Sequence, residues 1–168
     1  ATICGIYFFG FHALLIIAVS VASAVVSEYI WCRAIKKEPS LRDLSAIVTG
    51  LLLALNLPPT LPLWMAAVGS AIAIIVVKQM FGGLGHNFAN PAITARVVML
   101  IAFTGTMAAA VPPMAIAETV DVATYATPLS VLPNGTLPEA SLMDMFLGVR
   151  GGALGETSAA ALLIGFVY

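Results

Sequence analysis

The stretch Ile6–Ser27, IYFFGFHALLIIAVSVASAVVS, decides the fold class because it contains no Asp, Glu, Lys or Arg. A helix rises 1.5 Å per residue, so about 22 residues cross the roughly 30 Å hydrocarbon core of a bilayer. Tyr29 and Trp31 follow, and such residues gather at membrane interfaces. The stretch has no basic leader and is longer than the apolar part of a secretory signal. We therefore expect a retained transmembrane helix.

The composition supports a membrane protein. Of 168 residues, 61% are hydrophobic and 9% are charged, whereas soluble domains carry about a quarter charged residues. Seven Lys and Arg against eight Asp and Glu leave no basic surface for nucleic acid. Cys4 and Cys32 lie at opposite ends of one apolar run, so we expect no disulfide between them. His12 and His86 are isolated, and the sequence predicts no metal site.

The segment after the first helix indicates the orientation. Four of the seven basic residues cluster there, at Arg33, Lys36, Lys37 and Arg42. The positive-inside rule places this loop in the cytoplasm. Ser40 and Asp43 form the pattern of a capping box, which predicts that a helix begins there and continues through 46–55.

Three more helices follow from the pattern of apolar runs. Asn56 and the prolines at 58, 59 and 62 end the preceding helix, and the run Leu63–Met80 begins the next. Asn90 is a good N-cap and Pro91 suits the first helical position, which predicts a helix from Pro91 to about Phe103. A last apolar helix is predicted from Thr157 onward.

Residues 104–150 are too rich in proline and glycine for one continuous helix. No Lys or Arg lies between Val97 and Val149, and we expect this loop region on the outer face. The acidic residues of the region are Glu118, Asp121, Glu139 and Asp144. The short, interrupted helices predict an all-α, polytopic membrane protein with broken helices, arranged as in inverted-repeat transporters. Ordinary spans with misjudged ends are an equally good interpretation. Residues 1–168 would form one transmembrane domain, the front half of a longer subunit.

Several residues within the apolar runs could have a special role. Glu28 and Glu156 are interpreted as structural, Glu28 at the interfacial belt and Glu156 beside a helix start. Arg96 could pair a carboxylate, a lipid or a phosphate. The glycines in Phe81–Pro91, FGGLGHNFANP, follow no strand and precede no Lys-Ser/Thr, which argues against a nucleotide loop. We expect Gly82, Gly83 and Gly85 to allow positive φ and close approach of another backbone.

The segment 121–129, DVATYATPL, places hydroxyls and a carboxylate in apolar surroundings. Thr127 precedes Pro128, which pushes the backbone of Thr127 into an extended conformation and presents its Oγ. That geometry suits an acceptor for covalent modification. A simple solvent-exposed loop is the alternative.

Three stretches together resemble one family, which contains the D subunit of Rnf electron-transport complexes and the B subunit of sodium-pumping NADH:quinone oxidoreductases. Asp121, Thr124, Ala126 and Thr127 resemble its flavinylation signature, D-x-x-T-x-A-T. The run 78–92, KQMFGGLGHNFANPA, and the run 152–158, GALGETS, resemble two further motifs in the same order. The details of these runs resemble the Rnf member more closely.

The resemblance implies that Thr127 carries FMN through a phosphoester, attached by a separate flavin transferase that uses FAD. Asp121, Thr124 and Ala126 would be recognised by that transferase. Tyr125 departs from the family pattern, in which a small residue is usual, and this puts the local geometry of the loop in doubt. A non-covalent riboflavin elsewhere in the full subunit is a further cofactor that the resemblance allows. Arg96 could then meet a flavin phosphate.

The function implied by the resemblance is electron transfer between ferredoxin and NAD, coupled to export of Na⁺ or H⁺ across a bacterial inner membrane. The implied partners are two integral iron–sulfur subunits, a second flavinylated subunit, and cytoplasmic flavin and iron–sulfur subunits. The alternatives are the B subunit of the quinone reductase and a channel or transporter without redox function. The tripeptide Asn90-Pro91-Ala92 also occurs in water channels.

Overall fold

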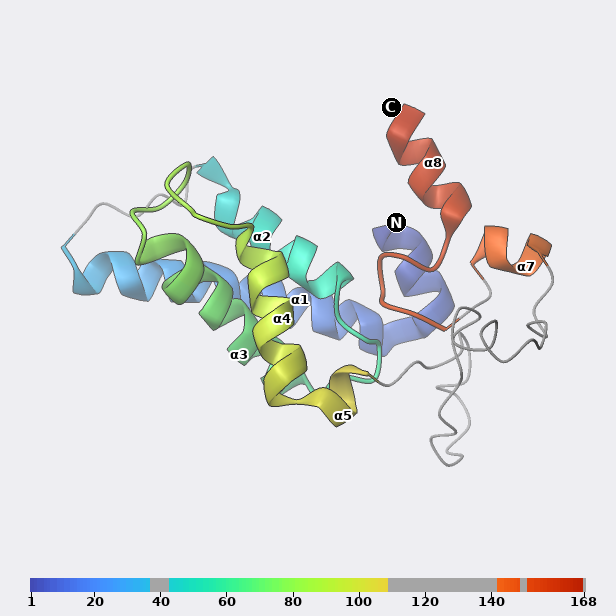
Figure 1. Cartoon of the computed structure of the whole chain (residues 1–168), viewed down its shortest axis with the longest axis horizontal. Coiled ribbons are helices and arrows are strands. Elements are labelled where there is room, and N and C mark those ends of the chain that lie inside the picture. Colours follow the sequence, from blue (N-terminus) through green and yellow to red (C-terminus); the bar gives the residue numbers. More distant parts are fainter. Residues whose placement is uncertain (37–42, 109–141, 149–150, 168) are drawn as a thin grey trace.

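The structure, a computed structural model, describes residues 1–36, 43–108, 142–148 and 151–167. Every regular element within these ranges is a helix. Figure 1 shows α1, Thr2–Ala34, as the long axis of the molecule, with α2, Ser45–Leu55, and α3, Leu63–Ala71, packed along it. The predicted all-α fold class is therefore confirmed for the described residues.

Helix α1 is longer than the predicted span of Ile6–Ser27. It has 33 residues, and among the described residues it is the one helix long and apolar enough to cross a bilayer. Gly10 interrupts it with φ 71° and ψ −157°, a conformation that a side chain would oppose. The buried positions recur every three or four residues, from Gly5 and Phe9 to Ala24 and Glu28, and they face the other helices.

The second apolar run is continuous but not uniform. Helix α3 passes directly into η2, a π-helix over Ile72–Gln79, and this part of the chain ends at the glycine loop. Helix α4, Pro91–Ala102, starts on Asn90 as predicted, because Asn90 Oδ1 accepts from the backbone N–H groups of Ala92 at 3.0 Å and Ile93 at 3.4 Å. The short helix α5, Thr104–Met107, follows it.

Two predicted helix starts are wrong. Helix α2 begins at Ser45 rather than at the proposed capping box, and Asp43 Oδ1 accepts from the Ser45 backbone N–H at 2.9 Å. Ser40 lies outside the described residues. Helix α8, Ala159–Val167, begins two residues after Thr157, with Ser158 Oγ accepting from the Ala161 N–H at 3.2 Å. In both cases a hydroxyl or carboxylate near the start satisfies free backbone N–H groups.

Small side chains bring the helices close. A Cβ added to Gly50 would lie 2.9 Å from Ser20 O and from Val21 Cα, so α2 and α1 touch backbone to backbone there. A cluster of buried apolar side chains lies between α1, α2, α3 and α4. Its largest members are Phe9, Ile16, Leu53, Leu57, Leu61 and Met99.

The segment before α8 closes one end of the bundle. Gly155 N–H donates to Leu55 O at 2.8 Å, and Leu154 N–H donates to Leu57 O at 3.1 Å. These bonds satisfy the carbonyl group of the last residue of α2 and one just after the helix. A Cβ added to Gly5 would lie 2.5 Å from Leu154 O, so the start of α1 lies against the same segment. Helix α7, Leu142–Leu147, precedes this segment, and α8 extends away from the bundle (Figure 1).

The glycine loop differs from expectation in one respect. Gly82, Gly83 and Gly85 have φ of 113°, 98° and 84°, which confirms the predicted positive φ. The predicted close approach of another backbone is wrong. Among the described residues, a Cβ on Gly85 would meet nothing within 4 Å. The atoms nearest to a Cβ on Gly82 and on Gly83 belong to the side chains of His86, at 3.4 Å, and Gln79, at 3.9 Å. These glycines serve the turn rather than helix packing.

Candidate functional site

The predicted flavin acceptor and its motif lie outside the described residues. They are Asp121, Thr124, Tyr125, Ala126 and Thr127. The candidate site that the structure describes lies elsewhere, where α1, α2 and η2 meet.

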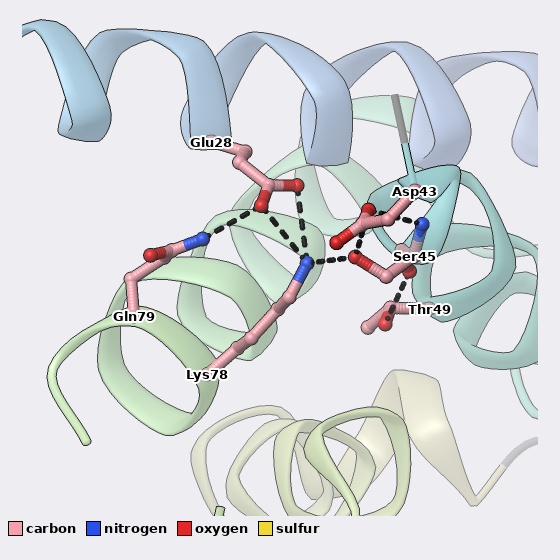
Figure 2. A network of polar contacts seen from close by, with 6 residues as sticks. All are labelled: Glu28, Asp43, Ser45, Thr49, Lys78 and Gln79. Atoms are coloured by element: carbon pink, nitrogen blue, oxygen red, sulfur yellow. Dashed lines mark hydrogen bonds and ion pairs between the residues drawn. The ribbon is translucent and has the colours of Figure 1, made fainter. Parts of the chain in front are cut away.

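A buried ion pair forms the centre of this site. Lys78 Nζ lies 3.0 Å from Glu28 Oε1 and 3.1 Å from Oε2, and the two side chains are 1% and 0% exposed. Figure 2 shows the ammonium group directed at both carboxylate oxygens, with the two residues entering from η2 and α1. Gln79 Nε2 donates to Glu28 Oε1 at 2.7 Å. Glu28 is therefore held by two consecutive residues of one helix.

The π-helix allows this double contact. Its bonds run from residue i to i+5, as in Met80 N–H to Ile75 O at 3.0 Å, so each turn is wider than in an α-helix. Lys78 and Gln79 both turn toward α1 in Figure 2 and both are buried. π-Helical turns occur often at functional sites, because they re-aim side chains at some cost in helix stability.

Polar contacts extend from the pair toward solvent. Lys78 Nζ also donates to Ser45 Oγ at 2.5 Å, and Ser45 Oγ donates to Asp43 Oδ1 at 2.6 Å. Ser45 is partly exposed and Asp43 is exposed. Thr49 Oγ1 donates to Ser45 O at 2.8 Å and so lies beside this chain of contacts without forming part of it. Figure 2 shows this series of hydrogen bonds from Asp43 through Ser45, Lys78 and Glu28 to Gln79.

The electrostatic surroundings differ at the two ends of this series of hydrogen bonds, near Asp43 and near Glu28. The hydroxyl of Ser45 donates to the Asp43 carboxylate and, with the Ser45 backbone N–H and the charge of Lys78, holds the pKa of Asp43 below its ordinary value. At the other end, two opposite charges are removed from water. Desolvation costs several kcal/mol per ion, and the mutual attraction repays this only where geometry and further hydrogen bonds are good.

Glu28, interpreted from the sequence as a structural residue at the interfacial belt, has a fully buried side chain that pairs with Lys78. One signal could have found the site. Glu28 and Lys78 each end a long apolar run, and the two runs are joined by one intervening helix. Opposite charges at the same end of two packed helices can pair across the interface.

Other candidate residues are placed outside this network. Arg96 Nη1 donates to Asn56 Oδ1 at 3.5 Å, which is a long contact between α4 and the end of α2. His12 Nδ1 lies 2.7 Å from Pro59 O. Cys4 and Cys32 are free thiols, as predicted. In the part of the chain that the structure describes, no three His, Cys, Asp or Glu side chains gather to hold a metal ion.

Comparison with known proteins supplies the family. The profile of the NQR2, RnfD, RnfE family matches residues 1–168, which is the whole chain. This chain belongs to that family. Membership agrees with the long apolar helix α1, and together they identify a membrane protein.

Similar proteins are named as D subunits of ion-translocating complexes. The D subunit of the Na⁺-translocating ferredoxin:NAD⁺ oxidoreductase complex of Acetobacterium woodii is 45% identical over 167 residues, covering 96% of this chain and 51% of the relative. The proton-translocating counterpart of Clostridium ljungdahlii is 38% identical and covers 100% of this chain and 53% of the relative. The D subunit of the ion-translocating oxidoreductase complex of Cronobacter sakazakii is 40% identical, covering 90% and 45%. The chain thus spans about half the length of these relatives.

Proposed function

We propose that this chain is part of a membrane subunit that carries electrons in an ion-translocating ferredoxin:NAD⁺ oxidoreductase complex, with FMN bound covalently at Thr127. The sequence D-x-x-T-x-A-T at 121–127, with a proline after the acceptor threonine, carries the proposal. The family and the names of the relatives support it, because those relatives are D subunits of such complexes.

The attachment requires only a presented hydroxyl on this chain. Thr127 Oγ would form a bond to the FMN phosphorus while the pyrophosphate bond of FAD breaks and AMP leaves, in a reaction performed by a flavin transferase. A following proline disfavours the helical conformation, so Pro128 would keep Thr127 extended, and Asp121, Thr124 and Ala126 would fit the transferase. The flavin supplies the redox chemistry when bound, and the protein positions it.

The placement in the membrane is part of the proposal. The four basic residues of 33–42 would face the cytoplasm, and the loop region around Thr127 would face the outside of a bacterial inner membrane. Further helices would cross the bilayer as a multi-pass bundle. A covalent bond suits this side of the membrane, because a flavin lost there could not return to the cytoplasmic pool. The other integral and cytoplasmic flavin and iron–sulfur subunits would be the partners.

Flavin fluorescence on a denaturing gel tests the function. The full-length subunit, produced in a host with its flavin transferase, is expected to fluoresce at its own mass after denaturation. The same protein from a host without the transferase is the control and should be dark. A subunit that never fluoresces, in a host whose transferase labels another substrate, would favour the non-redox channel or transporter instead.

A further inference from the structure

The loop between η2 and α4 carries a patch of exposed apolar side chains. Met80, Phe81, Leu84 and Phe88 form this loop patch, in which Leu84 is 64% and Phe88 is 68% exposed. The rings of Phe81 and Phe88 lie 4.8 Å apart and contact each other. Loops that face water are normally polar, and clustered exposed apolar side chains indicate a binding surface. We propose that the loop patch inserts into the interface of a bilayer that contains anionic phospholipid.

The loop is folded onto the end of η2 by hydrogen bonds. Gly83 N–H donates to Lys78 O at 3.0 Å, and Gly82 N–H donates to Gln79 O at 3.1 Å. The side-chain amide of Asn87, oriented so that its nitrogen donates, bonds to Gly83 O at 3.1 Å and to Lys78 O at 3.2 Å. These bonds satisfy carbonyl groups at the helix end that would otherwise need water. The loop can therefore enter a less polar medium at a smaller cost in unpaired backbone groups.

The buried ion pair sets the depth of the loop. The uncharged part of α1 ends at Ser27, and Tyr29 and Trp31, residue types that gather at membrane interfaces, follow it. Lys78 Nζ lies 3.0 Å from Glu28 Oε1, which holds the end of η2 beside this part of α1. Figure 1 shows the loop, in green, at the same end of the bundle as the end of α1 and the start of α2. The loop patch therefore lies at the level of the interface.

Basic side chains lie at this end of the bundle as well. Arg33 and Lys36 are exposed, and Arg33 follows Glu28 by five residues, which is about 7.5 Å along the helix axis. The segment 33–43 has four basic and two acidic residues. An excess of basic residues beside an apolar surface attracts anionic headgroups. Anionic phospholipid offers acyl chains to the loop patch and phosphate groups to the basic residues.

The inference goes beyond the proposed electron transfer, and it needs neither the flavin nor the residues at 121–127. A partner protein, or the part of a full-length subunit that lies outside this chain, could also cover an exposed apolar patch. The depth of the loop and the neighbouring positive charge favour lipid, because interfacial membrane segments combine apolar and basic side chains. In the full-length subunit without its partners, lipid contact and protein contact give different results.

Spin labels on the full-length subunit in lipid nanodiscs test the insertion. Leu84→Cys and Phe88→Cys are labelled separately in a protein without Cys4 and Cys32, and collisions of the nitroxide with O₂ and with a water-soluble nickel chelate are compared. In phosphatidylglycerol, both labels should collide more with O₂, which concentrates in hydrocarbon, than with the chelate. A label at Lys36→Cys, just after the end of α1, is the control and should show the opposite ratio.

The lipid composition tests the role of charge. Replacing phosphatidylglycerol by phosphatidylcholine should raise the collision rate of both loop labels with the chelate, because the basic residues then lack anionic headgroups. The double variant Arg33→Gln, Lys36→Gln should reduce this difference between the two lipids. Equal collision rates in the two lipids would overturn the choice of anionic phospholipid.

The side chains of the loop patch are exposed, so their replacement should leave the fold intact. An unchanged melting temperature of each labelled variant checks this, and Met80→Cys replaces a variant that fails the check. Labels that collide mainly with the chelate in both lipids would overturn the insertion. Labels shielded from both O₂ and the chelate would also overturn it, because they would show that another part of the subunit covers the loop patch.

Discussion

Lys78 Nζ lies 3.0 Å and 3.1 Å from the two carboxylate oxygens of Glu28, a residue 50 positions earlier in the chain. This contact joins the π-helical end of the second apolar run to the first long helix, at a place where both side chains are excluded from solvent. Removing either charge alone would leave the other buried in a medium of low dielectric constant without its counter-charge.

Removing the ammonium group should therefore destabilise the protein strongly. We expect Lys78→Met to lower the free energy of unfolding by about 3–5 kcal/mol, because it leaves the Glu28 carboxylate buried without its counter-charge. The double variant Glu28→Gln, Lys78→Met should recover most of this loss. Denaturant titration of the detergent-purified full-length subunit measures both. Arg33→Met, which removes an exposed charge at the end of α1, is the matched control. Equal effects of the single and double variants would contradict the prediction.

The acceptor of the flavin should be Thr127 rather than Thr124. Thr127 occupies the last position of the motif and precedes Pro128, whereas Thr124 has no following proline. Thr127→Ala should abolish in-gel fluorescence completely. Thr127→Ser, which keeps the hydroxyl group, should retain part of it. Thr124→Ala is expected to lower the extent of labelling without moving its site, as measured by mass spectrometry of the labelled peptide. A flavin still attached in Thr127→Ala would disprove the assignment.

The basic loop and the loop region with Thr127 should face opposite sides of the membrane. Single cysteines at positions 42 and 134, in a protein without Cys4 and Cys32, are treated with an impermeant maleimide in spheroplasts. Position 134 should react in intact spheroplasts, and position 42 only after lysis, because four basic residues lie within 33–42 and none lies between Val97 and Val149. The opposite pattern would reverse the orientation.

Replacing Gly85 should strain the backbone of the turn without causing a clash with neighbouring side chains. Its φ is 84° and an added Cβ would meet nothing within 4 Å, so Gly85→Ala is expected to cost about 1–2 kcal/mol through the left-handed backbone alone. Gly105→Ala also places a methyl group in open space, but within helix α5, and should be neutral or slightly stabilising. Thermal melting of the two variants checks the difference. Equal melting temperatures would show that the loop relaxes to accommodate the side chain.

The start of a helix can be predicted from the sequence where a few adjacent residues determine it. The cap formed by Asn90 and Pro91 depends on two adjacent residues, and the structure confirms it. The start of α2 is harder to place, because two overlapping patterns, Ser40 with Asp43 and Asp43 with Ser45, both offer side-chain oxygen to free N–H groups. The second pattern is the one observed.

The burial of Glu28 could not be predicted from periodicity. Helix α1 is apolar on every side, with exposed Ile3, Tyr7 and Phe11 as well as buried Phe9 and Ile16, so the sequence does not show which face meets the protein. The π-helical register of 72–79 has no sequence signature, and it brings Lys78 and Gln79 to the same carboxylate. The sequence thus predicts that Glu28 and Lys78 lie in helices. It does not predict which face of each helix packs against the protein, or that the two side chains form a pair.

The bonds from Gly155 and Leu154 to the end of α2 also set an order of events during biosynthesis. Leu55 O leaves the ribosome about a hundred residues before the N–H group of Gly155 that pairs with it. At usual rates of translation, this interval is roughly 5–20 seconds. During that time the carbonyl group of Leu55 needs another hydrogen-bond donor, such as water, because an unpaired buried carbonyl costs free energy. The end of α2 can reach its final packing only after residue 155 has been made.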